Sequence, residues 1–165
     1  MVADVCSLTL VELTEKLKLL GEPAYRAAQV FDWIYKKHKF SWEEMTSLPK
    51  PLRLKLSLET PFPVLVQKDA QISTDETRKF LFQLFDGQLI EAVFIPTKKR
   101  ATLCISSQAG CGMACPFCAT GQGGLTRNLS CGEIVEQVRL GMVAAESGDL
   151  AGGPTRVTNI VFMGM

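Results

Sequence analysis

Three cysteines constrain this chain more than any other feature of its 165 residues. Cys111, Cys115 and Cys118 stand in the stretch Gly-Cys-Gly-Met-Ala-Cys-Pro-Phe-Cys-Ala-Thr-Gly, which gives them a Cys-x3-Cys-x2-Cys spacing. Three thiolates so close in the chain can bind three irons of a cubic cluster and leave the fourth iron without a protein ligand. Electron-carrying 4Fe-4S sites use four cysteines. The spacing therefore predicts a cluster whose open iron is available to a substrate or a cofactor.

Zinc is the alternative metal for these thiols. Structural zinc takes four ligands, commonly as two pairs with Cys-x2-4-Cys spacing. The fourth ligand here would be Cys104, Cys131 or His38, and none of them stands at a standard distance along the chain from the three cysteines. The pattern therefore favours an iron–sulfur cluster over a zinc site.

The composition is that of an ordinary globular protein. Hydrophobic residues make up 47% of the chain and charged residues 21%, and the formal net charge of +1 gives no electrostatic reason to expect a polyanionic partner. The sequence has no apolar run long enough to span a bilayer and no secretory signal at its start. Six cysteines without such a signal indicate a reducing compartment, so we expect a cytoplasmic protein without a membrane segment.

Residues 1–60 have the pattern of a small helical module. Thr9 and Glu12 have the spacing of a capping box at the start of a helix. Pro23 fits the first turn of a second helix. A further segment, residues 52–56, carries leucine at every second position, which does not separate helix from strand.

Strands are predicted after residue 60. Residues 79–85 alternate between apolar and polar side chains, and residues 89–95 return as a second strand after the turn signal Asp86-Gly87. We therefore expect residues 61–98 to form a β-hairpin connection.

Residues 99–165 have the pattern of a parallel βαβ unit. Residues 101–107 form an apolar strand that leads directly to the three cysteines, Ser130 begins an amphipathic helix, and residues 157–163 form a second strand. Strands joined through a helix are expected to be parallel with a right-handed crossover. Ligands of α/β folds collect at the carboxyl ends of such strands, which is where the cysteines stand. The chain stops soon after the second strand, so we expect this unit to begin a longer sheet.

The sequence around the cysteines resembles the radical S-adenosylmethionine superfamily and, within it, the bacterial adenine-C2 RNA methyltransferases. The similar segments are Tyr25–Val30, Leu48–Pro49, Arg100–Ser107, Gln108–Cys111, Phe117–Gly121, Gly124–Leu129 and Glu133–Gln137. The resemblance implies an α/β fold in which a helical RNA-binding-like module and a β-hairpin precede the first βα units of a truncated radical-SAM partial (β/α) barrel. It also implies that the chain is the N-terminal part of an enzyme that continues for a comparable length.

The resemblance assigns the cofactor ligands. Cys111, Cys115 and Cys118 would bind a 4Fe-4S cluster, and S-adenosyl-L-methionine would bind its open iron. Phe117 would border the adenine of S-adenosyl-L-methionine. A role in shielding the cluster from water is the alternative for this side chain.

Two further residues match catalytic positions of the family. Cys104 matches a cysteine that releases a covalent protein–RNA intermediate, whereas its spacing alone would make it a small buried apolar side chain. Glu91 matches a carboxylate near the substrate base, a candidate for taking the C2 proton. From the sequence alone, Glu91 could equally be a solvent-facing residue of the hairpin.

The implied function is methylation of C2 of adenine in 23S rRNA and tRNA through a methyl-cysteine, by a monomer that takes electrons from a donor such as flavodoxin. An adenine-C8 rRNA methyltransferase and a non-catalytic iron–sulfur or RNA-binding fragment are the alternatives. In the family, the methyl-carrying cysteine and a Gly-Glu pair that holds the methionine amine come after the position of Met165. We therefore expect this chain alone to be inactive. The basic residues 36–39 and 98–100 are either phosphate contacts or ordinary solvated side chains.

Overall fold

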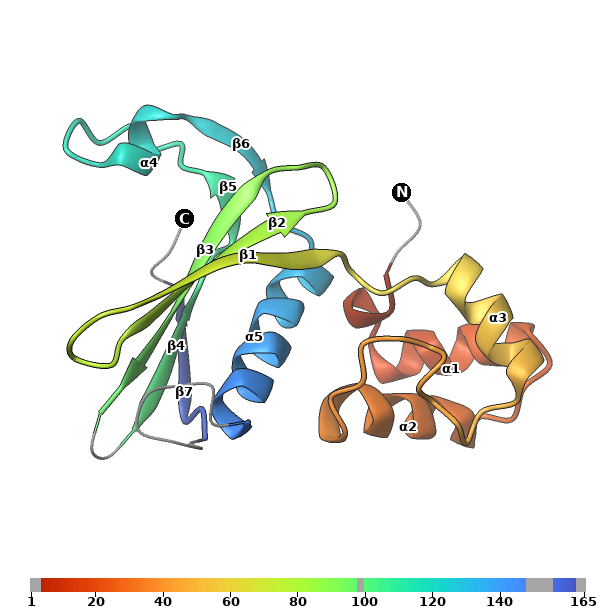
Figure 1. The fold of residues 1–165 in the computed structure, drawn as a ribbon. Helices are drawn as coiled ribbons and strands as arrows, with labels where there is room; N and C mark the ends of the chain where they lie inside the picture. The colour runs from red at the N-terminus through yellow and green to blue at the C-terminus, as the bar shows by residue number, and fades with distance from the viewer. Residues whose placement is uncertain (1–3, 98–99, 148–155, 163–165) are drawn as a thin grey trace. The chain divides into compact units, whose positions relative to one another are not determined.

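The computed structural model describes residues 4–97, 100–147 and 156–162. The chain divides into two compact units, Met1–Pro63 and Val64–Met165. In the part of the chain that is described, the first unit contains only helices and the second contains every β-strand (Figure 1).

The first unit contains the predicted helices, although the second of them begins after Ala24 and so leaves Pro23 just before the helix. It also decides the type of residues 52–56. Its elements are η1 (Val5–Ser7), α1 (Leu10–Leu19), α2 (Tyr25–Phe31), the π-helical turn η2 (Asp32–Lys36) and α3 (Lys50–Glu59). The capping box forms as expected: the Thr9 hydroxyl accepts from the backbone N–H of Glu12, and the Glu12 carboxylate accepts from that of Thr9. Residues 52–56 are helical, and the proline before them stands in the first turn of α3, where its missing N–H is not needed.

The helices of this unit pack around a small apolar core. Its fully buried side chains include Leu13, Leu17, Val30, Ile34 and Leu56. The indole N–H of Trp42 donates to the Thr60 carbonyl at 3.0 Å, and so ties the segment before α3 to the end of that helix.

The second unit is built on a five-stranded sheet with the order β1-β2-β3-β4-β7. The strands are β1 (Leu65–Ile72), β2 (Arg78–Leu84), β3 (Leu89–Pro96), β4 (Ala101–Ile105) and β7 (Asn159–Phe162). The first four pair antiparallel in sequence order, and β4 pairs parallel with β7. The predicted hairpin β2–β3 and the predicted parallel unit are thus both present. Met163, the expected end of the last strand, lies outside the described residues.

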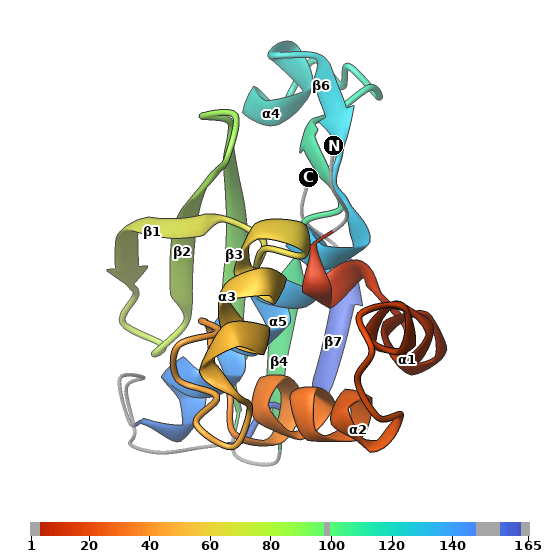
Figure 2. The same ribbon diagram turned by 90° about the vertical axis from the view of Figure 1, so that its right-hand side faces the viewer.

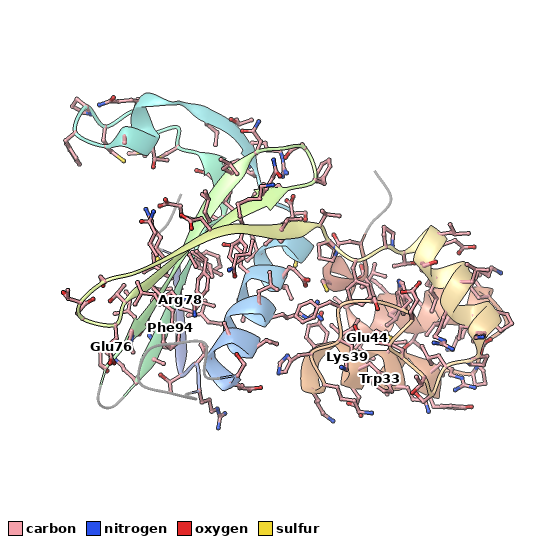
Figure 3. All side chains as sticks on the ribbon, in the orientation of Figure 1. Trp33, Lys39, Glu44, Glu76, Arg78 and Phe94 are labelled. Carbon is pink, nitrogen blue, oxygen red and sulfur yellow. The ribbon has the colours of Figure 1, made fainter. Side chains whose placement is uncertain are left out.

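Strand β1 extends the sheet beyond what the sequence predicted. Most of its side chains are exposed, so it lacks the apolar alternation that marks β2 and β3. After the turn that contains Glu76, β2 begins at Arg78, which pairs across the ladder with Phe94 of β3 (Figure 3). The expected hairpin connection and the expected βαβ unit therefore share one continuous sheet.

Helix α5 (Cys131–Glu146) covers one face of this sheet (Figures 1 and 2). Apolar side chains of β2, β3 and β4, among them Phe82, Phe94 and Leu103, form the core on this face. A Cβ at position 141 would lie 2.7 Å from Cδ2 of Leu103, so glycine at this position lets the helix approach the sheet. Side chains alternate along a strand, and so the residues next to Leu103 face away from α5.

Candidate functional site

The three cysteines lie on a loop that leaves and rejoins the fold through a short antiparallel ladder. Strand β5 (Gln108–Gly110) pairs with β6 (Leu125–Asn128), and the helical turn α4 (Ala119–Gln122) lies between them (Figure 1). The backbone N–H of Cys111 donates to the Gly124 carbonyl at 2.9 Å and closes the base of the loop. We call residues 111–124 the cysteine loop.

Glycine is required at the base of the cysteine loop. Gly110 has a φ of 76°, and a Cβ at this position would lie 2.1 Å from the Gly124 carbonyl oxygen. A Cβ at Gly121 would lie 2.9 Å from the backbone nitrogen of Cys115. Both distances are shorter than real Cβ contacts, so the loop can turn this tightly only because these side chains are absent.

The cysteines are the best shielded residues in the first part of the loop. Within residues 111–118, Cys111, Cys115 and Cys118 are half-buried and the other five residues are exposed. All three thiols are free, and the Cys118 N–H donates to the Cys115 carbonyl at 3.1 Å. The loop thus presents three unmodified thiols whose neighbours in sequence face solvent.

The thiols are not gathered into a metal-binding geometry. No group of three or more His, Cys, Asp or Glu side chains in the described ranges is arranged to hold a metal ion. The donors nevertheless suit an iron–sulfur cluster, since cluster ligands are cysteine thiolates and three free ones share this loop. Assembly of a site would require their side chains to converge.

Phe117, predicted to border a cofactor, is 88% exposed, and Met113 on the same loop is 77% exposed. An aromatic ring this open is not part of the apolar core. It is free to cover a ligand bound at the thiols.

Cys104 and Glu91 lie on the same face of the sheet. Cys104 on β4 pairs with Val93 on β3, and residues paired across an antiparallel ladder share a face. Glu91 lies two residues before Val93 on β3, and so its side chain points to the same face. Because Leu103 packs toward α5, this is the face that α5 leaves uncovered.

The surroundings of these two side chains differ. Cys104 is buried, with 7% of its surface exposed. The Glu91 side chain is 42% exposed and forms an ion pair of 3.0 Å with Lys79 on β2. Glu91 therefore combines features of both alternatives, a carboxylate near the substrate base and a solvent-facing residue. It lies on the third of five strands, yet its side chain reaches solvent. A half-exposed carboxylate beside an ammonium group can accept a proton from a ligand that reaches this face.

A buried glutamine holds the end of β4 where the chain turns toward the cysteines. The Gln137 side chain of α5 accepts from the Ser106 N–H at 2.9 Å and donates to the Ser106 carbonyl at 3.0 Å. The Ser106 hydroxyl donates to the Glu91 carbonyl at 2.6 Å. Gln137 and Ser106 are both fully buried. The amide of Gln137 therefore satisfies both backbone polar groups of Ser106 where β4 ends.

Arg127 on β6 connects the ladder at the base of the cysteine loop to two other parts of the fold. The sequence did not predict these contacts. The Arg127 guanidinium donates two hydrogen bonds of 2.8 Å to the Glu133 carboxylate of α5. Its Nε donates at 2.6 Å to Asp86 in the β2–β3 turn, 41 residues earlier in the sequence. Glu133 also completes the capping box of α5, because it accepts from the Ser130 N–H at 2.8 Å. Its second role, as a partner of Arg127, is not part of the capping pattern, and it is the contact between Arg127 and Asp86 that a long separation along the chain concealed.

These contacts shift the ionisation of the groups involved. Burial alone would raise the pKa of Glu133, but the hydrogen bonds from Arg127 and Ser130 outweigh it and hold the pKa below its usual value. The hydrogen bond from Arg127 likewise lowers the pKa of Asp86. The hydrogen bonds to Glu133 and Asp86 raise the pKa of Arg127. The three side chains are therefore charged at neutral pH.

The basic segment of the first unit is largely engaged in local contacts (Figure 3). Lys36 pairs with Asp32 at 2.7 Å, and the Lys37 ammonium lies 3.7 Å from the centre of the Trp33 ring. Lys39 pairs with Glu44 at 3.1 Å. Of the other basic segment, Lys98 and Lys99 lie outside the described residues.

Comparisons with known proteins identify the family. Residues 3–60 match the family described as "Ribosomal RNA large subunit methyltransferase N-terminal domain". A "Probable dual-specificity RNA methyltransferase RlmN" from Rhodococcus erythropolis is 53% identical over 156 residues, which are 93% of this chain and 42% of that protein. A relative of the same name from Streptomyces griseus is 47% identical over 163 residues, which are 98% of this chain and 44% of that protein.

A solved structure agrees with these relatives. It is a radical SAM methyltransferase from Sphaerobacter thermophilus, which is 43% identical and superposes with a TM-score of 0.91 over 99% of this chain and 47% of that protein. Over nearly its whole length, the chain is similar to the N-terminal part of these methyltransferases. It spans less than half the length of the family members it matches. The predicted family and the predicted α/β fold class are thereby confirmed.

Among the residues that the structure describes, no helix is both long enough and apolar enough to cross a bilayer.

Proposed function

We propose that this chain provides the iron–sulfur site and part of the substrate face of an enzyme that methylates C2 of adenine in 23S rRNA and tRNA. One observation carries the proposal. The cysteine loop, with three free thiols, follows the first parallel strand of a fold that superposes on a radical SAM methyltransferase at a TM-score of 0.91.

The chain's own residues have distinct roles in this proposal. Cys111, Cys115 and Cys118 would hold a 4Fe-4S cluster, which supplies one-electron chemistry to bound S-adenosyl-L-methionine. Phe117, exposed beside the second and third thiols, would cover the adenosyl group of that cofactor. An electron donor such as flavodoxin would supply the reducing electron to the monomeric enzyme.

Cys104 and Glu91 would act on the RNA base from the face of the sheet opposite α5. Glu91 would accept the proton from C2 of adenine, because its carboxylate reaches solvent from the middle of the sheet. Cys104 would release the covalent protein–RNA intermediate, for which a thiol on the same face is suitably placed. The positive charges of the first unit would contact RNA phosphates.

Anaerobic reconstitution with iron and sulfide tests the cluster. We expect a 4Fe-4S signal in the EPR spectrum of the reduced chain and a shift of that signal on addition of S-adenosyl-L-methionine. Cys111→Ala, Cys115→Ala and Cys118→Ala should each abolish the signal, and Cys131→Ala should retain it. Binding of zinc in place of iron would contradict the proposal.

A chimera tests the reaction itself. This chain would be joined to the remaining part of the Rhodococcus erythropolis relative and incubated with 23S rRNA and tRNA. We expect 2-methyladenosine in both RNAs and loss of product in Cys104→Ala. Formation of 8-methyladenosine would identify the C8 reaction instead.

A further inference from the structure

The cysteine loop makes few contacts of its own with the rest of the fold. Among the described residues, the hydrogen bonds made by residues 111–124 stay within the loop, as in the bonds from Cys111 to Gly124 and from Gln122 to Pro116. The position of the loop therefore depends on the β5–β6 ladder at its base. Whatever fixes that ladder also fixes the thiols.

The ladder has an apolar anchor and a charged anchor. Ala109 of β5 and Leu129 after β6 are buried in the core of the second unit. These small contacts hold the ladder against the sheet, but apolar packing has no preferred direction. The charged anchor is Arg127 of β6, which makes directed hydrogen bonds to α5 and to the β2–β3 turn.

The geometry at Arg127 uses the shape of the guanidinium group. Its two terminal nitrogens donate hydrogen bonds to the two carboxylate oxygens of Glu133, and its Nε donates one to Asp86. The guanidinium carbon Cζ lies 5.1 Å from the centre of the Phe85 ring. A lysine ammonium carries its three donors on one atom and does not reproduce this planar fork. Arg127 of β6 therefore fixes its orientation relative to both the Glu133 carboxylate on α5 and the Asp86 carboxylate in the β2–β3 turn.

Both partners of Arg127 matter for the proposed chemistry. Glu133 begins α5, whose Gln137 holds the end of β4 just after Cys104. Asp86 lies in the turn that leads into β3, the strand that carries Glu91. Arg127 thus contacts α5, which holds the end of β4, and the turn that leads into β3.

We propose that Arg127 is a positioning residue, which orients the cysteine loop relative to the sheet face that carries Glu91 and Cys104. This inference rests on the proposed function, because the loop needs a set orientation only if its thiols bind a reactive group near that face. Arg127 itself touches neither a thiol nor the substrate face. It acts through Glu133 and Asp86.

Hydrogen exchange of the 165-residue chain without metal tests the orientation. In Arg127→Met we expect amides of residues 108–128 to exchange about ten- to a hundredfold faster, since charge-assisted hydrogen bonds are lost. Amides of β2, β3 and α1 should keep their wild-type rates. Arg127→Lys should give intermediate rates, because the charge remains without the fork.

Three further variants control this measurement. Glu133→Gln and Asp86→Asn should each reproduce part of the effect, because each removes one partner of Arg127. Asp32→Asn, which breaks the exposed pair with Lys36 in the first unit, should leave residues 108–128 unchanged. Unchanged exchange of residues 108–128 in Arg127→Met would overturn the proposal. So would equal acceleration throughout the second unit, which would indicate general destabilisation.

EPR of the reconstituted chain separates the two proposals. If the wild-type chain binds a cluster, Arg127→Met should change its g values or abolish the shift caused by S-adenosyl-L-methionine, and Arg127→Lys should restore part of it. A spectrum identical to that of the wild type would overturn the role of Arg127 and leave the proposed function standing. A wild-type chain that binds no cluster would overturn the proposed function and, with it, the positioning role, whatever the exchange rates show.

Discussion

Arg127 and Glu133 form a doubly hydrogen-bonded ion pair between β6, the strand that follows the cysteine loop, and the first turn of α5. The Glu133 side chain is 4% exposed and that of Arg127 is 26% exposed, so the pair lies at the boundary between core and solvent. Glu133 serves two purposes at once, because it also completes the capping box with Ser130. Its ionised form is the one that both contacts require.

Stability should fall in acid through Glu133. Its pKa is lowered in the folded state, so its carboxylate stabilises the fold above the unfolded pKa of about 4.3 and loses that effect as the pH falls through the folded pKa. Asp86 acts in the same direction, since its pKa is also lowered. Urea unfolding followed by circular dichroism should show the loss as the pH falls below about 5.

A matched pair of variants isolates this effect. At neutral pH we expect Glu133→Gln to lower the free energy of unfolding by about 1–3 kcal/mol and to flatten the acid dependence. Glu12→Gln changes the other capping box, whose glutamate is exposed and has no arginine partner. It should have the smaller effect. Equal effects of the two variants would contradict the importance of Arg127.

Gly110→Ala should destabilise the base of the cysteine loop. The added methyl group would combine a positive φ with a 2.1 Å approach to a backbone carbonyl, and we expect a loss of about 3 kcal/mol or more. Gly124→Ala is the matched control, since Gly124 also has a positive φ but nothing lies within 4 Å of its Cβ position. This control should lose only about 1 kcal/mol. Thermal unfolding of both variants measures the difference.

Gly141→Ala should push α5 away from the sheet. Alanine has the better helix propensity by about 1 kcal/mol, but its methyl group would collide with the buried Leu103 side chain at 2.7 Å. Overpacking costs about 1–3 kcal/mol, so we expect a net loss. Combining it with Leu103→Val should recover part of the loss in a urea titration. Stabilisation by Gly141→Ala alone would show that Leu103 moves aside freely.

Gln137→Leu should loosen the end of β4. The change removes two hydrogen bonds to the buried backbone of Ser106, at a cost of about 2–4 kcal/mol. Gln122→Leu is the control, because Gln122 bonds the Pro116 carbonyl at an exposed position, and its loss should stay below about 0.5 kcal/mol. Hydrogen exchange at residues 104–108 would locate the effect of Gln137→Leu.

The local features of the fold could be predicted because their causes are local. The capping boxes at Thr9 and Ser130 join residues three apart, and the hairpin between β2 and β3 depends on the short turn that contains Asp86 and Gly87. Strand β1 could not be predicted, because its mostly exposed side chains leave no alternation and its pairing with β2 alone defines it.

The sequence by itself determined the family and the candidate ligands, because the cysteine spacing is a property of the chain alone. Only the tertiary structure decided that Cys104 and Glu91 share the face that α5 leaves open, since this follows from the register of β3 and β4. Only the tertiary structure joined Arg127 to Asp86, from which 41 residues separate it. A sequence pattern shows which side chains a segment contains and how they are spaced. The partners of a charge in a folded chain depend on which segments pack together.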